Sequence, residues 1–250
     1  MPLPKVNRPS FFVTLPVKKE KIECVPYMVS DDKLLLMAKE SGKVAEIAST
    51  TQQIVKRCVV TPDVNVEKLS KSDINYIFMN LRAKSVGEEI TMNWVCNNTV
   101  PDGSDETRAC GHEFEMKINI SDVKFNHDKH DLKSHDIKIG NGVGMKLGLP
   151  VYDYELNFDE TDDDITNTIK MGYACLECVY ETENVTPKNE IKLDEFLEWI
   201  MNEFPTEQFQ KLEDYIETLP YFEINKKHKC EKCGFEHNFN ISDEDVLNFF

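Results

Sequence analysis

Apolar residues change their spacing several times along this chain, and each spacing predicts a different kind of element. The first 27 residues alternate prolines with short runs of β-forming residues, which predicts extended chain and a short hairpin. Apolar residues from Val44 to Cys58 recur at helical spacing, so we expect one long or two short helices between residues 30 and 58. Ser72 offers an N-cap before a one-sided apolar stripe, and residues 72–83 are therefore predicted to form an amphipathic helix.

Alternation with a period of two then replaces the helical pattern, and it predicts two strands. Residues 90–96 and 114–120 each direct every second, apolar side chain to one face. The intervening residues 97–109 are rich in Asn, Asp, Gly and Ser, so we expect a polar loop with a mobile tip. Two further short strands, 221–225 and 236–241, are predicted near the end of the chain around a cysteine-containing turn.

The region between these two pairs of strands combines a β-like island with three helical patterns. The island lies around residues 143–152, and the glycines at its start predict a bulge or a hairpin turn. Acidic residues 159–164 complement the dipole of a following helix, whose apolar stripe comprises Ile165, Ile169, Tyr173, Leu176 and Tyr180. Residues 193–204 and 206–219 are amphipathic and are separated by Pro205, which predicts a helical hairpin.

Composition narrows the class of partner. The chain has 250 residues, 40% of them hydrophobic, so it can bury a substantial core. Its formal net charge of -16 repels phosphate backbones and anionic membrane surfaces, which argues against nucleic acid and membranes as partners. No stretch has the roughly 20 apolar residues of a membrane helix, and the first residues lack the apolar core of a signal peptide. We therefore expect a soluble, cytosolic protein.

The cysteines carry the strongest chemical signal. The turn Lys229-Cys230-Glu231-Lys232-Cys233-Gly234 has the form of a zinc knuckle, in which two thiolates two residues apart reach one metal ion. Its glycine allows backbone amides to approach the sulfur atoms. One knuckle supplies only two of the four ligands of a tetrahedral structural site, so a second pair is needed.

A weak internal sequence repeat predicts that Cys96 and Cys110 are this second pair. The segments starting at Cys110-Gly111 and at Cys233-Gly234 both run through an alternating strand to Ile-Ser-Asp, so each resembles half of a zinc ribbon. We predict one structural zinc ion held by Cys96, Cys110, Cys230 and Cys233. Two alternatives stay open: Cys96 and Cys110 are ordinary buried cysteines, or His112 or His237 replaces one of the ligands.

Other candidate residues are interpreted structurally. Cys175 and Cys178 fall within the predicted helix and are expected to be core residues, while Cys24 and Cys58 are expected to be buried thiols. Three histidines are each followed by Asp and could bind a divalent metal in a hydrolase, but their spacing matches no helical metal motif and a solvated loop is favoured. These histidines are His127, His130 and His135.

These elements predict an α+β fold, in which antiparallel strands with a zinc-ribbon-like element pack with amphipathic helices. We divide the chain into three parts. Residues 1–88 form an extended segment with helices, residues 89–125 and 221–250 form the ribbon-like β unit, and residues 126–220 form a central α/β insertion with the helical hairpin.

Several short blocks are spread along nearly the whole chain. They are Pro4-Lys5-Val6-Asn7-Arg8-Pro9, Leu15-Pro16, Pro26-Tyr27-Met28-Val29, Leu34-Leu35-Leu36-Met37-Ala38, Glu40-Ser41, Asp73-Ile74, Tyr76-Ile77-Phe78, Leu81-Arg82-Ala83-Lys84-Ser85-Val86-Gly87-Glu88, Thr206-Glu207-Gln208-Phe209, Glu217-Thr218-Leu219-Pro220 and Phe249-Phe250. Together these blocks resemble the baseplate hub protein family of T-even-like bacteriophages, while residues 121–160 match poorly. The resemblance implies a non-enzymatic hub component or hub-assembly factor that binds other phage baseplate hub proteins. The alternative is a zinc-ribbon module that binds nucleic acid or belongs to the transcription apparatus, for which the ribbon strands carry few basic residues.

Overall fold

The computed structural model describes residues 6–101, 107–152 and 161–242. In these ranges the chain forms six α-helices and several small antiparallel sheets, which confirms the predicted mixture of helices and antiparallel strands. The predicted mobile tip of loop 97–109 lies mostly outside the described residues. None of the helices in the described part is long and apolar enough to cross a membrane.

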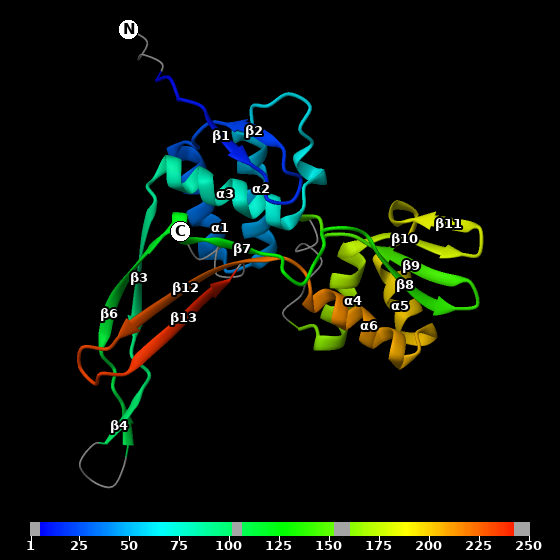
Figure 1. Ribbon diagram of the computed structural model, residues 1–250. Coiled ribbons are helices and arrows are strands. Elements are labelled where there is room, and N and C mark those ends of the chain that lie inside the picture. The colour runs from blue at the N-terminus through cyan, green and yellow to red at the C-terminus, as the bar shows by residue number, and fades with distance from the viewer. Residues whose placement is uncertain (1–5, 102–106, 153–160, 243–250) are drawn as a thin grey trace.

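The N-terminal part packs three helices against a small hairpin (Figure 1). Strands β1 (Phe11–Thr14) and β2 (Lys21–Cys24) pair antiparallel, which confirms the predicted hairpin. Helices α1 (Val29–Ser41) and α2 (Val44–Cys58) are the two short helices expected. Their buried side chains share one core with helix α3 (Lys71–Ser85).

The N-cap of α3 differs from the prediction. Ser70, not Ser72, caps this helix, and its hydroxyl accepts a hydrogen bond of 3.2 Å from the backbone N–H of Asp73. Ser72 is instead a buried residue within the first turn. Serine is a favoured N-cap residue at either position, so the sequence alone does not distinguish Ser70 from Ser72. The packing of the first turn decides between them.

Two long hairpins follow and lie side by side (Figure 1). Strand β3 (Glu89–Val95) pairs with β6 (Glu113–Asn119), and β12 (Tyr221–Lys229) pairs with β13 (Glu236–Ser242). Strand β7 (Lys124–Asn126) adds to the other edge of β12. The four predicted strands are thus present, and the two hairpins, about a hundred residues apart in sequence, form separate sheets that pack against each other through one apolar cluster.

The remaining part is a second small α/β unit. Its sheet has the order β11-β10-β9-β8 and comprises β8 (His135–Gly140), β9 (Val143–Leu147), β10 (Leu176–Glu181) and β11 (Asn184–Pro187). Three helices pack on the sheet through one apolar cluster; they are α4 (Asp164–Cys175), α5 (Leu193–Glu203) and α6 (Thr206–Glu217). The predicted glycine turn lies between β8 and β9, and the two predicted helices are present as α5 and α6, each of which packs on α4.

One predicted helix is too long. The apolar stripe was expected to continue through Leu176 to Tyr180, but α4 ends at Cys175 and the chain enters β10 directly. Residues 176–181 pair with both β9 and β11, and this pairing outweighs a helical spacing that includes only two further apolar positions. Cys178 is therefore in a strand, not in mid-helix, and only Cys175 is fully buried.

Candidate metal centre

Four cysteine sulfur atoms meet at the ends of the two long hairpins. Cys96 and Cys110 flank β3 and β6, while Cys230 and Cys233 lie in the turn between β12 and β13. Their sulfur atoms all lie within 4.8 Å of one another, and no other group of this kind exists among the residues that the structure describes. Cys96 Sγ is 3.7 Å from Cys233 Sγ, and Cys110 Sγ is 3.9 Å from Cys230 Sγ. Tetrahedral coordination with Zn–S bonds of about 2.3 Å separates sulfurs by about 3.8 Å.

The two turns have the same backbone design. The N–H of Gly111 donates to Cys96 O at 3.0 Å, and the N–H of Gly234 donates to Cys230 O at 2.8 Å. Both glycines have positive φ, 62° and 73°, a conformation that side chains with a Cβ rarely adopt. The first cysteine of each turn also donates its N–H across the turn, at 2.8 Å, to the carbonyl of the residue after the glycine. The repeated Cys-Gly pattern in the sequence thus corresponds to two equivalent turns.

An aromatic layer next to the sulfurs joins the hairpins. Trp94 lies opposite Phe114 on one hairpin, and His228 lies opposite His237 on the other, at matching distances from the cysteines. Phe114 stacks on His228 with ring centroids 3.9 Å apart and an interplanar angle of 8°. Trp94 packs against Phe239 at 4.7 Å. The faces of the two hairpins are therefore pressed together, and the sulfurs are held at one end of their contact.

The surroundings of the sulfurs favour different protonation states when no metal is bound. The backbone N–H of Phe235 and the side-chain amide of Asn98 lower the pKa of Cys233 to about 6. Burial raises the pKa of Cys96 to about 12 and also raises that of Cys110. Metal binding would require all four thiols to lose their protons, and a bound cation stabilises thiolates directly.

Of the polar groups around the sulfurs, only His237 was considered in the sequence, as an alternative ligand. Its Nε2 lies 3.2 Å from Cys96 Sγ, beside the group of four sulfurs. Asn98 Nδ2 is 3.6 Å from Cys233 Sγ, and Lys232 Nζ donates to Cys110 O at 3.0 Å. The internal repeat aligns His237 with Phe114. This alignment is the one sequence signal that could have placed His237 on the face of its hairpin that meets the other hairpin.

The polar segment 97–109 contains structure that the sequence did not predict. Strands β4 (Thr99–Pro101) and β5 (Thr107–Ala109) pair antiparallel and extend the first hairpin beyond the sulfurs (Figure 1). The backbone N–H of Cys110 donates to Asn98 O at 2.7 Å, which closes the base of this extension. The thirteen residues 97–109 can therefore stand where a zinc knuckle usually has two residues between its cysteines, without separating Cys96 from Cys110.

The other singled-out cysteines lie apart from the cluster. Cys24 and Cys58 are buried in the N-terminal core, as expected, and burial raises their pKa to about 12 and about 11. Burial likewise raises the pKa of Cys175 to about 12. None of these three belongs to a group of possible metal ligands among the described residues, and a buried thiol with a raised pKa is a poor nucleophile, so they act as small core side chains.

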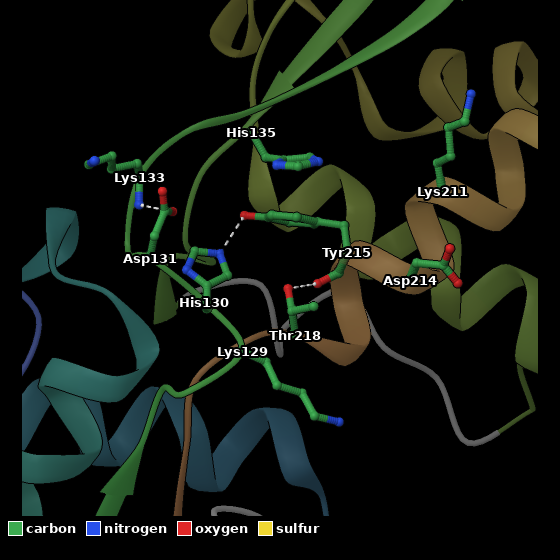
Figure 2. A pocket seen from close by; sticks show the side chains of 9 residues that line it. All are labelled: Lys129, His130, Asp131, Lys133, His135, Lys211, Asp214, Tyr215 and Thr218. Atoms are coloured by element: carbon green, nitrogen blue, oxygen red, sulfur yellow. Dashed lines mark hydrogen bonds between the residues drawn. The ribbon is translucent and has the colours of Figure 1, made fainter.

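The histidine segment forms the wall of an open cavity of about 480 Å³ against helix α6 (Figure 2). His130 Nε2 lies 3.4 Å from Tyr215 Oη, and its Nδ1 accepts the N–H of Leu132 at 2.8 Å. Tyr215 donates its own hydroxyl proton to Gly148 O at 2.8 Å, while His135 stacks on its ring. His130 is buried, so the solvated loop expected here is wrong for this residue. Both ring nitrogens of His130 are engaged in packing the segment onto α6.

Acidification is expected to loosen this contact. Burial lowers the pKa of His130 below 6.5, and His135 and His127 act in the same direction while Asp131 opposes them. The neutral ring is thus favoured in the folded state, so its stabilising effect is present above about pH 6.5 and is lost as pH falls below it. Thermal unfolding between pH 8 and 5 should show a smaller acid-induced fall in Tm for His130→Gln than for the unmodified protein. Equal slopes would contradict the assignment.

The fold and the cysteine cluster together define a mixed α/β protein with a candidate structural metal centre between two hairpins. By comparison with known families, the chain belongs to the T4 bacteriophage base plate protein family, which it matches over residues 8–250. The resemblance to T-even-like baseplate proteins is thereby confirmed. The match concerns baseplate proteins in general, and membership implies contacts with other phage structural proteins. No curated protein and no solved structure matches the chain.

Proposed function

We propose that this chain serves in building the hub of the tail baseplate, as a component or an assembly factor, by binding other hub proteins. The observation that carries the proposal is the family match over residues 8–250, which supports a role in the baseplate. The sequence blocks that resemble hub proteins are the reason for assigning this role to the hub. The net charge of -16 suits protein partners better than nucleic acid. We place its work in the host cytoplasm, where tail proteins are assembled.

We further propose that Cys96, Cys110, Cys230 and Cys233 hold one zinc ion. Three of these side chains are buried and the fourth is half-buried, and a purely thiolate tetrahedral set is typical of structural zinc. The ion would supply no chemistry to a substrate, because all four positions are taken by protein ligands. Its effect would be to fasten hairpin β3–β6 to hairpin β12–β13, which are joined otherwise by the aromatic layer.

The nucleic-acid alternative has less support around this site. Two lysines of the second hairpin are already used within the chain, since Lys226 pairs with Asp122 at 3.0 Å and Lys232 donates to Cys110 O. Lys227 and Lys229 are the other lysines in the strands of this hairpin, whereas nucleic-acid sites present clustered Lys and Arg, and the chain as a whole is strongly acidic. A salt-dependent mobility shift with DNA or RNA at physiological ionic strength would reinstate this alternative.

The hub proposal is tested in infected cells. A phage lacking this chain should accumulate tail intermediates without complete hubs, and an affinity-tagged copy supplied in trans should restore them and co-purify with hub proteins. Mass spectrometry of purified virions then decides between a component, which is present, and an assembly factor, which is not. Normal baseplates in the absence of the chain, or co-purification with peripheral baseplate proteins instead of hub proteins, would overturn the proposal.

His237 is expected to strengthen metal binding without being a ligand. An N–H group that faces a thiolate sulfur stabilises its charge, and loss of such outer partners commonly weakens metal affinity 10- to 100-fold. His237→Phe keeps a ring in the aromatic layer but removes the nitrogen 3.2 Å from Cys96 Sγ. Zinc transfer to a chromophoric chelator should become easier by about this factor, while His127→Phe, which alters a ring packed on Phe125, should leave it unchanged. Identical transfer curves for both variants would contradict the role.

A further inference from the structure

Helix α1 buries only one narrow stripe of its surface. The stripe consists of Asp31, Leu35 and Ala38, and Asp31 pairs with Arg57 of helix α2 at 2.9 Å. These positions recur every three to four residues and face the protein. Val29, Lys33, Leu36 and Glu40, on the opposite side of the helix, are exposed in the described part of the chain.

That opposite side is unusually apolar for a surface helix. Val29 is 87% exposed, Leu36 48% and Met37 55%, and Val44, just beyond the end of the helix, is 49% exposed. Singly scattered apolar residues are normal on a protein surface, but a group on one helix face marks a site of association. The uninterrupted apolar run from Leu34 to Ala38 thus places side chains on both the buried and the exposed side of the helix.

The exposed face is also complementary to itself. Val29, Lys33, Leu36 and Glu40 are spaced by four, three and four residues, the repeat that lines the seam of a pair of helices. When this face meets a reversed copy, Lys33 lies opposite Glu40 at both ends and Leu36 lies opposite Met37 in the middle. No ion pair of Lys33 or Glu40 is found within the described part of the chain.

We propose that two copies of this chain associate through α1, antiparallel, about a two-fold axis next to Leu36 and Met37. Two-fold contacts require that one patch match itself, and the doubled Lys33–Glu40 pairing meets this condition. A helix of 13 residues is about 20 Å long, so the contact belongs to the small, reversible class and depends on protein concentration. The inference goes beyond the hub proposal and does not depend on it.

The charge pair allows a swap experiment. Sedimentation velocity of the zinc-loaded full chain, over a concentration series, should show a monomer–dimer equilibrium. Lys33→Glu sets two carboxylates against each other at each end, and Glu40→Lys sets two ammonium groups there, so each should weaken dimerisation about tenfold or more. The double variant should return it toward the original value. Lys138→Glu makes the same charge change on the exposed part of strand β8 and should have no effect.

Three outcomes would overturn the proposal. A chain that stays monomeric throughout the series excludes self-association, and one that is monomeric but binds another baseplate protein through Leu36 assigns the face to that partner instead. A dimer that both single swaps leave intact uses another surface. A double variant no better than the single ones excludes the antiparallel register, provided circular dichroism shows that all variants are folded. A monomeric result would leave the hub proposal unaffected.

Discussion

Cys230→Ser is expected to remove the bound zinc and to lower Tm by more than about 10 °C. Structural zinc contributes about 10–16 kcal/mol of apparent binding free energy in finger peptides, and 1 kcal/mol corresponds to about 2–4 °C for a chain of this size. Cys230 is 1% exposed and lies 3.9 Å from Cys110 Sγ, so a hydroxyl placed there faces a buried, incomplete ligand set. The metal content is measured by elemental mass spectrometry and Tm by calorimetry.

Matched measurements separate metal loss from simple core damage. Cys178→Ser removes a half-buried thiol away from the cluster, and it should retain one equivalent of zinc and nearly the original Tm. A chelator should lower the Tm of the unmodified protein toward that of Cys230→Ser and should have little effect on the variant. An iron-loaded protein would be recognised by its visible absorption.

Several results would contradict the zinc assignment. The first is a reduced, folded protein that contains no metal and does not respond to a chelator. The second is a thiol count four lower than expected, because the close pairs Cys96–Cys233 and Cys110–Cys230 would then be oxidised. The third is full retention of zinc in Cys230→Ser.

The sequence anticipated the elements with strong local signals. Period-two alternation located β3, β6, β12 and β13, because each strand has one buried face. The repeated Cys-Gly pattern selected the four cysteines whose sulfur atoms the structure brings together. A long-range contact was accessible in this case only because the same local motif occurs twice.

Features that depend on tertiary pairing were not accessible in the same way. The change from helix α4 to strand β10 is decided by pairing with β9 and β11, and neither neighbour is marked in the sequence of residues 176–181. The choice of Ser70 as the cap, beside its bridge to Val151, and the burial of His130 against Tyr215 have the same origin. Each is set by a surface that exists only after distant segments have packed.

The division of the chain into three parts stays a prediction, and one core residue tests how the first two are coupled. Phe222 of strand β12 is 1% exposed and belongs to the apolar cluster beneath the hairpins. Its ring stacks on Tyr76 of helix α3 with centroids 5.7 Å apart and lies 5.1 Å from the ring of Phe125. The same side chain therefore contacts the helical part and the β unit.

Phe222→Ala is expected to destabilise the protein by about 3–5 kcal/mol, because it removes buried apolar surface and leaves a cavity between helix and sheet. Tm should fall by about 6–20 °C. If α3 and the hairpins unfold together, the fluorescence of Trp94, measured in a Trp199→Phe background because the chain has two tryptophans, and far-UV circular dichroism should report the same lowered midpoint. The zinc content of the folded variant should be unchanged, since Phe222 lies at the far end of β12 from Cys230.

The neighbouring residue provides the control for this substitution. Tyr221 is 39% exposed, and its hydroxyl accepts a hydrogen bond of 2.9 Å from Asn126 Nδ2 at the surface. Tyr221→Ala should therefore cost only about 1 kcal/mol. Equal losses for the two variants would show that the Phe222 ring does not join helix α3 to the sheet. Two separate transitions in Phe222→Ala, with the fluorescence midpoint lowered and the helical midpoint unchanged, would show that the N-terminal helices fold independently of the hairpins.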